Sequence, residues 1–551
     1  MKKRCPQHPF ETRESARERE MHSTALLVGV VVYENKTQAW QVELLDSLAQ
    51  MCRTLVIAIP PATNPVPGVM KYLWRMTAAS CRALVPTKLP GGYQQFLVST
   101  DFDVPPIQQE PDVIVDLTGN APDHWGVGPR HGLLRLSDSE GRPIGHPFPA
   151  LGTGQEGRRI RVVRLARSNG SLVAVVRWAR FGSHGLSNTA SLERTYRTAI
   201  RLVLQAVKDI RAGTLHEESH PQPKSSPLTV VRVAAALVAD QCRLFFERVR
   251  AIALSESWMI GLIDDPIEQL ITKPEEPTIR WQGQREAYRY LADPFGWPGD
   301  ASRIYCEEFQ YERGVGTILE LALSRDHIVA EHKVAFPTVG HLSYPFLFRH
   351  GAQVYCLPEA GASRRCVLYV ESAHGRAWQP HAVLLESTAA ADPTIFAWGG
   401  LFWLAYTDME IGASDNLCLC YAERLEGPWI PHSNNPVKID IRSARPAGSP
   451  FWHDGQLYRP AQDCGPTYGG GICINRVLRC SPTEFREEAV RLLSPARLGR
   501  NPDGLHTISA WDGRCLVDGK RHVIKLLVSY RKAASRLTRL GLLRRRVQER
   551  E

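Results

Sequence analysis

A unit of apolar, turn and aromatic positions returns along the second half of the chain. In each copy a short apolar run opened by Pro or Gly precedes a Gly-containing turn and a strand marked by Tyr305, Tyr355, Trp403, Tyr458 and, in a weaker fifth copy, Leu516. The spacings are 50, 48, 55 and 58 residues. Such a period fits a blade of four strands and predicts an all-β five-bladed propeller over 256–520. Because a propeller aims the innermost strand of every blade at its axis, residues far apart in sequence can form one site there.

The first part of the chain has a different pattern. The apolar runs Ala25–Val32, Leu55–Ile59 and Val113–Val115 are typical of strands buried on both faces. Helical spacing follows the first run over 40–51 and returns over 191–212. Alternation of strand and helix predicts an α/β domain over 21–211, with its crevice at the carboxyl ends of the strands. No G-x-G-x-x-G string directly follows any of these three runs, so no dinucleotide is implied.

Three connecting segments complete the predicted organisation. Residues 212–228 are rich in Pro, Ser and charge and are predicted to form a linker, and 229–255 have the spacing of a connector helix. The strand containing Trp258 is expected to close the ring by pairing with the final blade, since an open ring leaves exposed edges. Residues 521–551 are predicted to form a basic helix.

Charge narrows the choice of partners. The net charge is +10, but eleven Lys and Arg against two Glu from Lys520 to Glu551 supply +9 of it. The rest of the chain is nearly neutral, so a nucleic-acid partner is not indicated. The basic tail fits either contact with an anionic membrane surface or packing on its own domain, and both readings stay open.

Cysteine usage and hydropathy indicate the compartment. Thirteen Cys, an odd number, include no C-x-x-C pair, which is typical of a reducing compartment and gives no argument for a metal site. The longest apolar runs are too short to span a bilayer, and the first twenty residues lack the apolar core of a signal peptide. We therefore expect a cytoplasmic protein, peripheral at the inner membrane face if the tail binds lipid, with Met1 or Met21 as its start. No cofactor is indicated.

Several rigid strings in the second half carry a family resemblance. They are WMIG at Trp258, ADPF at Ala292, EEF at Glu307, HLSYPF at His341, RSARPAG at Arg442, RPAQD at Arg459 and GLHT at Gly504. In this order they resemble the propeller domain of plant glucosamine inositolphosphorylceramide transferases and of bacterial homologues of that module. The strings PDVIVDLTGN and GLLRLSDSEG more weakly resemble formyltransferase-like domains that accompany this propeller in bacteria. The resemblance implies an enzyme that acts on a sugar or glycolipid.

The propeller is also similar to that of arabinanase, xylosidase and invertase type glycosidases. In those enzymes a blade-one Asp is base or nucleophile, a blade-three Asp tunes pKa and orients, and a blade-four Glu is the acid. Asp293 and Asp392 match the first two places, but Arg445 and its neighbours stand where the Glu is expected. Glu308 and Asp463 are the candidate replacements. Since glycosyl transfer needs one ionised and one protonated carboxyl, the departure puts hydrolysis in doubt.

Cationic and titratable residues at blade starts are the candidate substrate-binding groups. They are His341 and Ser343 in one string, Arg442 and Arg445 in another, and His506 in the last. An Arg facing the cavity suits a phosphorylated sugar or lipid headgroup, because its planar fork binds two oxygens at once. The competing reading of Arg445 is a structural bridge to Asp392 or Asp293.

Formyl transfer in the first domain is the remaining chemistry to weigh. Folate-dependent formyltransferases use an Asn, a His before Pro and an Asp, and this chain offers Asn120, His124, His131 and Asp138 without the His-Pro string at that place. The function predicted from sequence is therefore glycosyl or formyl transfer in polysaccharide or glycolipid biosynthesis, with a sugar in the propeller cavity. The alternative is a non-catalytic carbohydrate-binding scaffold for a partner enzyme.

Overall fold

The structure is a computed structural model, and it describes two compact units that are treated separately below. The described residues are 26–34, 37–59, 83, 95–97, 110–121, 129–138, 141–144, 160–169, 172–182, 188–217, 242, 245–247, 249–250, 253–282, 286, 288–338, 340–372, 377–495 and 503–524. The predicted linker and connector helix fall mostly outside these ranges, and so does the tail beyond residue 524. No helix within the described ranges is long and apolar enough to cross a membrane.

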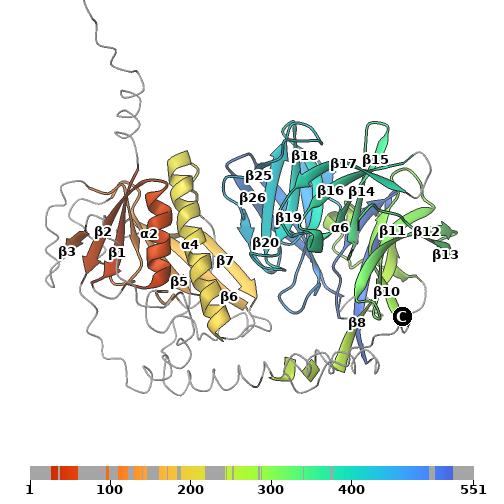
Figure 1. The fold of residues 1–551 in the computed structure, drawn as a ribbon, viewed down its shortest axis with the longest axis horizontal. Coiled ribbons are helices and arrows are strands. Elements are labelled where there is room, and N and C mark those ends of the chain that lie inside the picture. Colours follow the sequence, from red (N-terminus) through yellow and green to blue (C-terminus); the bar gives the residue numbers. More distant parts are fainter. Residues whose placement is uncertain are drawn as a thin grey trace, which may run out of the picture. The chain divides into compact units, whose positions relative to one another are not determined.

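The N-terminal unit is built on one sheet, shown from red to yellow in Figure 1. Its strand order is β3-β2-β1-β4-β5-β6-β7. The strands are β1 (Leu27–Tyr33), β2 (Arg53–Ile59), β3 (Gln95–Leu97), β4 (Val113–Asp116), β5 (Leu133–Asp138), β6 (Ile160–Asn169) and β7 (Leu172–Gly182). Pairing is parallel from β3 through β5 and becomes antiparallel at β6. The predicted α/β architecture is confirmed.

Two long helices of this unit carry apolar stripes. Helix α2 (Ala39–Ala49) buries Trp40, Leu44 and Leu48, and α4 (Asn188–Ala212) buries positions three or four residues apart along its length. The rings of Trp40 and Tyr196 meet at 5.0 Å between centroids. This spacing is what an amphipathic helix needs in order to cover hydrophobic surface.

The C-terminal unit is a five-bladed propeller, drawn from green to blue in Figure 1. Blade one contains β10 (Arg289–Gly296), β11 (Arg303–Gln310), β12 (Val315–Ser324) and β13 (His327–Lys333), and blade two contains β14 (Ser343–His350), β15 (Gln353–Glu359), β16 (Cys366–Glu371) and β17 (Trp378–Leu385). Blade three contains β18 (Ala390–Trp398), β19 (Leu401–Asp408), β20 (Asn416–Ala422) and β21 (Ile430–Pro431), with β22 (Lys438–Ile439) also on β20. Blade four contains β23 (Phe451–His453), β24 (Gln456–Gln462), β25 (Ile472–Cys480) and β26 (Phe485–Leu493).

Blade five closes the ring. It joins β27 (Ile508–Trp511) and β28 (Arg514–Ile524) to β8 (Leu254–Ile263) and β9 (Arg280–Trp281), so strands from both ends of the propeller share one sheet. The pairing of β28 with β8 is antiparallel and places Lys520 opposite Trp258. Closure by the Trp258 strand is therefore confirmed, and β28 continues as strand to Ile524, beyond residue 520.

The innermost strands of the first three blades share a bulge that turns one side chain toward the axis. The register shifts after Ala292, Ser343 and Ala391, and the next residues, Asp293, Tyr344 and Asp392, have φ of +50°, +47° and +49°. Left-handed backbone is costly for non-glycine residues and is concentrated at functional or over-determined positions. In blade four the corresponding place is taken by Gly448, where φ is +119° and an added Cβ would lie 1.7 Å from the Ile508 oxygen.

Candidate functional site

Backbone amides at the three bulges donate into buried carboxylates. The amide of Asp293 donates to Asp518 Oδ2 at 2.9 Å, and that of Tyr344 donates to Asp293 Oδ2 at 3.2 Å. The amide of Asp392 donates to Glu359 Oε2 at 3.0 Å. The unusual backbone is thus held by the acids that it brings together. We call Asp293, Glu307, Glu359, Asp392, Arg445, His506 and Asp518 the axial cluster.

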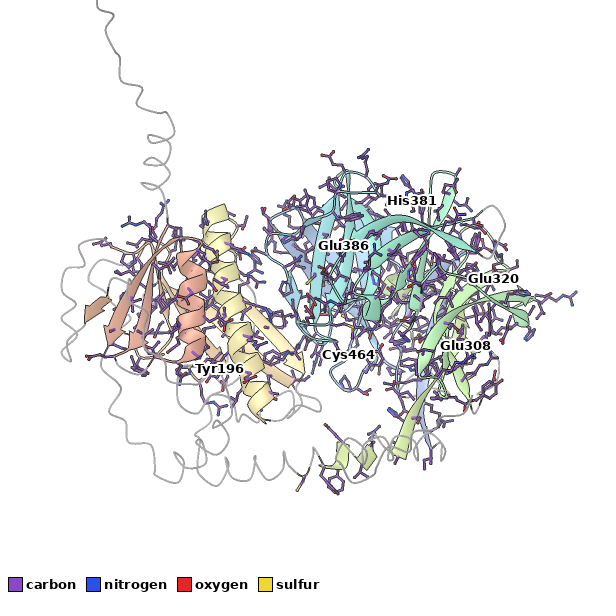
Figure 2. The ribbon with its side chains drawn as sticks, viewed as in Figure 1. Tyr196, Glu308, Glu320, His381, Glu386 and Cys464 are labelled. Carbon is purple, nitrogen blue, oxygen red and sulfur yellow. The ribbon has the colours of Figure 1, made fainter. Side chains whose placement is uncertain are left out.

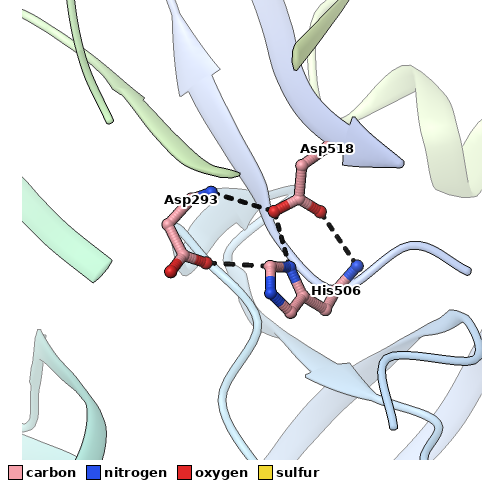
Figure 3. A group of neighbouring side chains, drawn as sticks. All are labelled: Asp293, His506 and Asp518. Atoms are coloured by element: carbon pink, nitrogen blue, oxygen red, sulfur yellow. Dashed lines mark hydrogen bonds and ion pairs between the residues drawn. The ribbon is translucent and has the colours of Figure 1, made fainter. Parts of the chain in front are cut away.

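Asp293 lies beside an Asp518–His506 ion pair (Figure 3). His506 Nδ1 is 2.5 Å from Asp518 Oδ2 and 3.7 Å from Asp293 Oδ1, which also accepts from the Thr507 hydroxyl at 2.6 Å. Burial alone would lower the pKa of His506, but the two carboxylates outweigh it and raise this pKa to about 9. Burial, with Asp518 and Asp392 nearby, raises the pKa of Asp293 to about 6, against the opposing effect of His506.

The same three side chains could be read as a metal site, because their ligand atoms lie within 4.8 Å of one another. Asp518 already accepts from the backbone amides of Asp293, His506 and Thr507 and faces the protonated ring nitrogen of His506. A ring nitrogen that donates a proton has no lone pair for a metal. The arrangement is that of an ion pair, and it gives no argument for a cation.

Asp392 is held by an arginine. Arg445 Nε donates to Asp392 Oδ2 at 2.6 Å and Nη2 to Oδ1 at 3.2 Å, while Gln462 Nε2 donates to Oδ2 at 2.7 Å. Arg445 also lies 3.9 Å from Glu359 Oε2. Such a fork fixes the carboxylate in one orientation. Of the two predicted readings of Arg445, the bridge to Asp392 is what the geometry shows.

Two tyrosines mark the limits of the cluster. The Tyr344 hydroxyl crosses the axis: it accepts from the Gly448 amide of blade four at 2.7 Å and lies 2.9 Å from the Thr394 hydroxyl of blade three. Tyr468 stands at the other limit, with its ring 5.1 Å from the Arg445 guanidinium carbon and 5.6 Å from the His506 ring. As a residue Tyr468 is 37% exposed, so part of it reaches the surface beside the cluster.

Three axial acids, Glu307, Glu359 and Asp518, were not among the predicted site residues. Glu307 on β11 is paired with Ala292 of β10, and Glu359 ends β15 opposite Ser343. Burial, and then the neighbouring carboxylates, raises the pKa of Glu307 well above its ordinary value and that of Glu359 to about 8. Strand alternation was the available signal, since it places Glu307 and Glu308 on opposite faces of β11.

The two predicted substitutes for the blade-four acid lie elsewhere. Glu308, labelled in Figure 2, accepts from Arg289 Nη1 at 2.9 Å and from Gln310 at 2.8 Å. Asp463 caps its own turn by accepting from the Gly465 amide at 2.9 Å. Burial raises the pKa of Asp463, opposed by that amide and by Arg442. In both cases the preceding residue, Glu307 or Gln462, is the one that joins the axial cluster.

The predicted binding residues divide in the same way. Arg445 and His506 belong to the axial cluster, and His341 lies at its edge, with Nε2 3.8 Å from Glu307 Oε1. Ser343 is buried on β14 opposite Glu359. The charge of Arg442 lowers the pKa of Asp463, so Arg442 lies near that residue. The structure thus brings together five of the predicted residues: Asp293, Asp392, His341, Arg445 and His506.

A cavity of about 270 Å³ lies beside the cluster, between β8 and blade one. Its lining includes Trp258, Tyr290, Arg289, Glu286 and Glu331. The Trp258 ring also stacks on His506 at 3.8 Å, so one side chain borders both the cavity and the axial cluster.

The residues considered for formyl transfer are spread over the N-terminal sheet. Asn120 follows the carboxyl end of β4, whereas His131 precedes the amino end of β5, its parallel neighbour. The two therefore lie at opposite ends of neighbouring parallel strands. Asp138 accepts from Arg142 Nε at 2.7 Å, and His124 lies outside the described residues. The described part of this unit does not assemble the predicted set.

Comparison with known proteins finds relatives of the propeller. The family described as "Glucosamine inositolphosphorylceramide transferase 1, N-terminal" matches residues 289–515. The enzyme of that name from Oryza sativa subsp. japonica is 29% identical over 236 residues, covering 41% of this chain and 30% of the relative. The Arabidopsis thaliana enzyme is 29% identical over 278 residues, covering 44% and 35%. The chain spans about a third of the length of these curated relatives, and the family match does not reach the N-terminal unit.

The solved structures that match part of this chain include glycoside hydrolases. Zg3597, a family 117 glycoside hydrolase of Zobellia galactanivorans, has 13% identity and a TM-score of 0.29, covering 42% of this chain and 84% of that one. The exo-beta-1,3-galactanase 1,3Gal43A of Clostridium thermocellum has 10% identity and a TM-score of 0.30, covering 38% and 52%.

Proposed function

We propose that the axial cluster binds a sugar and that the chain carries out glycosyl transfer in the synthesis of a glycan or glycolipid. One observation carries the proposal: Asp293 and Asp392 occupy equivalent bulges of blades one and three but have different environments. Asp392 is clamped by Arg445, whereas Asp293 accepts from a hydroxyl and an amide. Carboxyls in contrasting environments are the usual sign of divided acid–base roles.

Asp293 is the residue assigned to the chemical step. Its pKa of about 6 leaves it ionised at neutral pH, yet close enough to neutrality to accept a proton from an incoming hydroxyl. The neighbouring His506 keeps a positive charge beside it and so favours the ionised form. Asp392, fixed by Arg445, serves to orient the sugar, and its negative charge helps to keep the pKa of Asp293 raised.

The sugar class follows from the surroundings and from the relatives. Tyr468 is a partly exposed aromatic residue next to the cluster, and aromatic faces pack on the apolar faces of sugars. The curated relatives carry the name "Glucosamine inositolphosphorylceramide transferase 1". We therefore infer a hexose or amino sugar donor and a phosphorylated glycan or glycolipid acceptor.

Aryl glycosides of common hexoses and of glucosamine test this assignment with the full chain. Asp293→Asn should lower turnover by about 10³-fold while changing affinity little, because a general base contributes about 10²–10⁴ in rate. Asp512→Asn is the matched control, since Asp512 also has a left-handed backbone (φ +48°) but lies in the β27–β28 turn. Equal turnover by Asp293→Asn and the control would refute the catalytic role.

A binding scaffold is the second candidate, and the cavity beside β8 favours it. This cavity is lined by the aromatic residues Trp258 and Tyr290 but includes none of the axial acids. Calorimetry with the same glycosides distinguishes the two functions. Binding that survives Asp293→Asn but fails in Trp258→Ala, without turnover by the unchanged protein, would favour the scaffold.

A cytoplasmic location and membrane contact by the basic tail remain part of the proposal. The nine Lys and Arg between residues 525 and 551 would attract an anionic surface. Flotation with phosphatidylserine liposomes at two salt concentrations tests this, because salt screening should release an electrostatic contact.

Formyl transfer to an amino sugar is a further proposal for the N-terminal unit, motivated by its weak formyltransferase resemblance. Calorimetric titration with a reduced folate tests it, and absence of binding would remove it.

A further inference from the structure

The axial cluster contains one carboxyl, that of Glu307, to which no residue described by the structure donates a hydrogen bond. Asp518, Asp392, Asp293 and Glu359 each accept at least one hydrogen bond from a backbone amide or a side chain. For Glu307 no such donor exists in the part of the chain that the structure describes, and His341 Nε2 lies 3.8 Å from its Oε1. Glu307 is nevertheless only 5% exposed.

The surroundings of Glu307 are built to hold it. An added Cβ on Gly316 would lie 2.2 Å from Glu307 Oε1, so a glycine at this place leaves room for the carboxyl. The Gly316 amide donates to His341 Nδ1 at 2.8 Å. Since Nδ1 accepts, the neutral imidazole carries its proton on Nε2, the nitrogen that faces Glu307.

We propose that Glu307 is the acid that gives its proton to the oxygen of the leaving group, in place of the missing blade-four glutamate. This assignment rests on the proposed glycosyl transfer. The bond from the anomeric carbon to the leaving oxygen breaks, and that oxygen takes the Glu307 proton. The hydroxyl of the acceptor, or water, forms the new bond to the anomeric carbon and gives its proton to Asp293. After products leave, exchange with solvent returns the proton from Asp293 to Glu307.

Proton affinities in the cluster agree with these roles. Burial and the negative charges of Asp293, Glu359, Asp518 and Asp392 keep the pKa of Glu307 well above that of a free glutamate. The pKa of Asp293 is about 6. One carboxyl is therefore protonated while its neighbour is ionised, as acid–base catalysis requires. Burial lowers the pKa of His341, so this ring stays neutral and can donate to the Glu307 carboxylate formed during the step.

Glu359 is the rival donor, and its contacts argue against it. Its Oε2 accepts from the Asp392 amide at 3.0 Å and lies 3.9 Å from the Arg445 guanidinium, and both contacts oppose the rise that burial causes in its pKa. Glu359 is thus engaged in holding blade three in place. Glu307, without such a task, is free to cycle between its protonated and ionised forms.

Leaving-group dependence tests the assignment with the full chain. A methyl glycoside needs a proton on its leaving oxygen, whereas a dinitrophenyl glycoside of the same sugar, glucosamine, does not. Glu307→Gln should lower kcat/KM on the methyl glycoside by about 10²–10⁴ but by less than about tenfold on the dinitrophenyl glycoside. Glu308→Gln, which alters the opposite strand face, should leave the ratio of the two rates unchanged.

Four results would overturn the assignment. Equal losses on both glycosides would remove Glu307 as the donor and leave the proposed function intact, and a selective loss in Glu359→Gln would give the role to Glu359. No turnover of either glycoside by the unchanged protein would refute the proposed function itself. Infrared difference spectra of the unchanged protein provide a test that does not depend on folding of a variant. Absence of a protonated glutamic acid band near neutral pH would refute the assignment, and Glu307→Asp should keep the band that Glu307→Gln removes.

Discussion

Replacing Asp293 by Asn should stabilise the propeller near neutral pH. The folded-state pKa of Asp293 is raised from an ordinary 3.8 to about 6, so keeping this carboxylate ionised costs about 3 kcal/mol at pH values above 6. Asn removes the charge at nearly constant size. It also tolerates the left-handed backbone at this position better than most other residues.

The gain is reduced by one hydrogen bond. The Asn oxygen can keep the bond from the Tyr344 amide, and the Thr507 hydroxyl can rotate to accept from the new amide group instead of donating. Rearranging these hydrogen bonds around an amide in place of the carboxyl group costs about 1 kcal/mol at either pH. The expected net stabilisation is therefore about 2 kcal/mol at about pH 7.

The sign of the effect should depend on pH. Because the folded pKa of Asp293 exceeds the unfolded one, its ionisation does not destabilise the fold below pH 3.8. The destabilisation grows between pH 3.8 and about 6 and is complete above about pH 6. At about pH 4 only the weaker hydrogen bonding remains, and the variant should be about 1 kcal/mol less stable than the unchanged protein.

Urea unfolding followed by tryptophan fluorescence measures both values, because nine of the thirteen Trp lie between Trp258 and Trp511. Asp512→Asn, in a turn with the same backbone conformation, should change the free energy of unfolding by no more than about 0.5 kcal/mol at either pH. Equal destabilisation by Asp293→Asn at both pH values would show that the carboxylate carries no electrostatic cost, and the reasoning would fail.

Three further changes test the centre of the propeller. Arg445→Met should lower the free energy of unfolding in urea by about 3–5 kcal/mol, because it leaves the Asp392 carboxylate buried without its cation. Adding Asp392→Asn should restore part of that free energy, and no restoration would contradict the ion pair. Tyr344→Phe removes the acceptor of a buried amide, so we expect a loss of about 1–3 kcal/mol and faster amide exchange at Gly448; unchanged exchange would argue against the contact. Gly448→Ala should abolish folding as judged by circular dichroism, whereas Gly399→Ala, with open space around it, should cost about 1 kcal/mol; a folded Gly448→Ala protein would contradict the close approach.

The periodic part of the fold could be predicted from sequence. Each blade repeats one pattern of apolar run, turn and aromatic strand, and burial of inner strands such as β14 on both faces produces that pattern directly. Closure of the ring by the Trp258 strand could also be predicted, because an open ring leaves unpaired strand edges. The bulges did not follow, since an Asp-Pro or Tyr-Pro pair is equally typical of an ordinary turn.

The site residues show where pattern reasoning lost accuracy. Asp293, Asp392 and Arg445 were identified because they open repeats, and the structure brings them together. Glu308 and Asp463 were chosen over Glu307 and Gln462, which lie one position earlier and face the cluster. A one-residue difference reverses the face of a strand, and only the pairing register settles it. Glu359 carried no signal of its own, because its contact with Asp392 depends on the neighbouring blade.

Buried charges elsewhere in the propeller show why the axial cluster is better explained by function than by stability. Glu487 is as deeply buried as the axial acids, but Arg459 and Lys438 outweigh that burial and lower its pKa. In the axial cluster, five carboxyls face only two cations, Arg445 and His506, and the pKa values of Glu307, Glu359 and Asp293 are all raised. A fold that gained only stability from these residues would give each carboxylate at least one cation, as it does at Glu487, which faces two. Acids left unmatched at a shared axis keep protons available near neutral pH, which is useful to a reaction that must give one proton and take another.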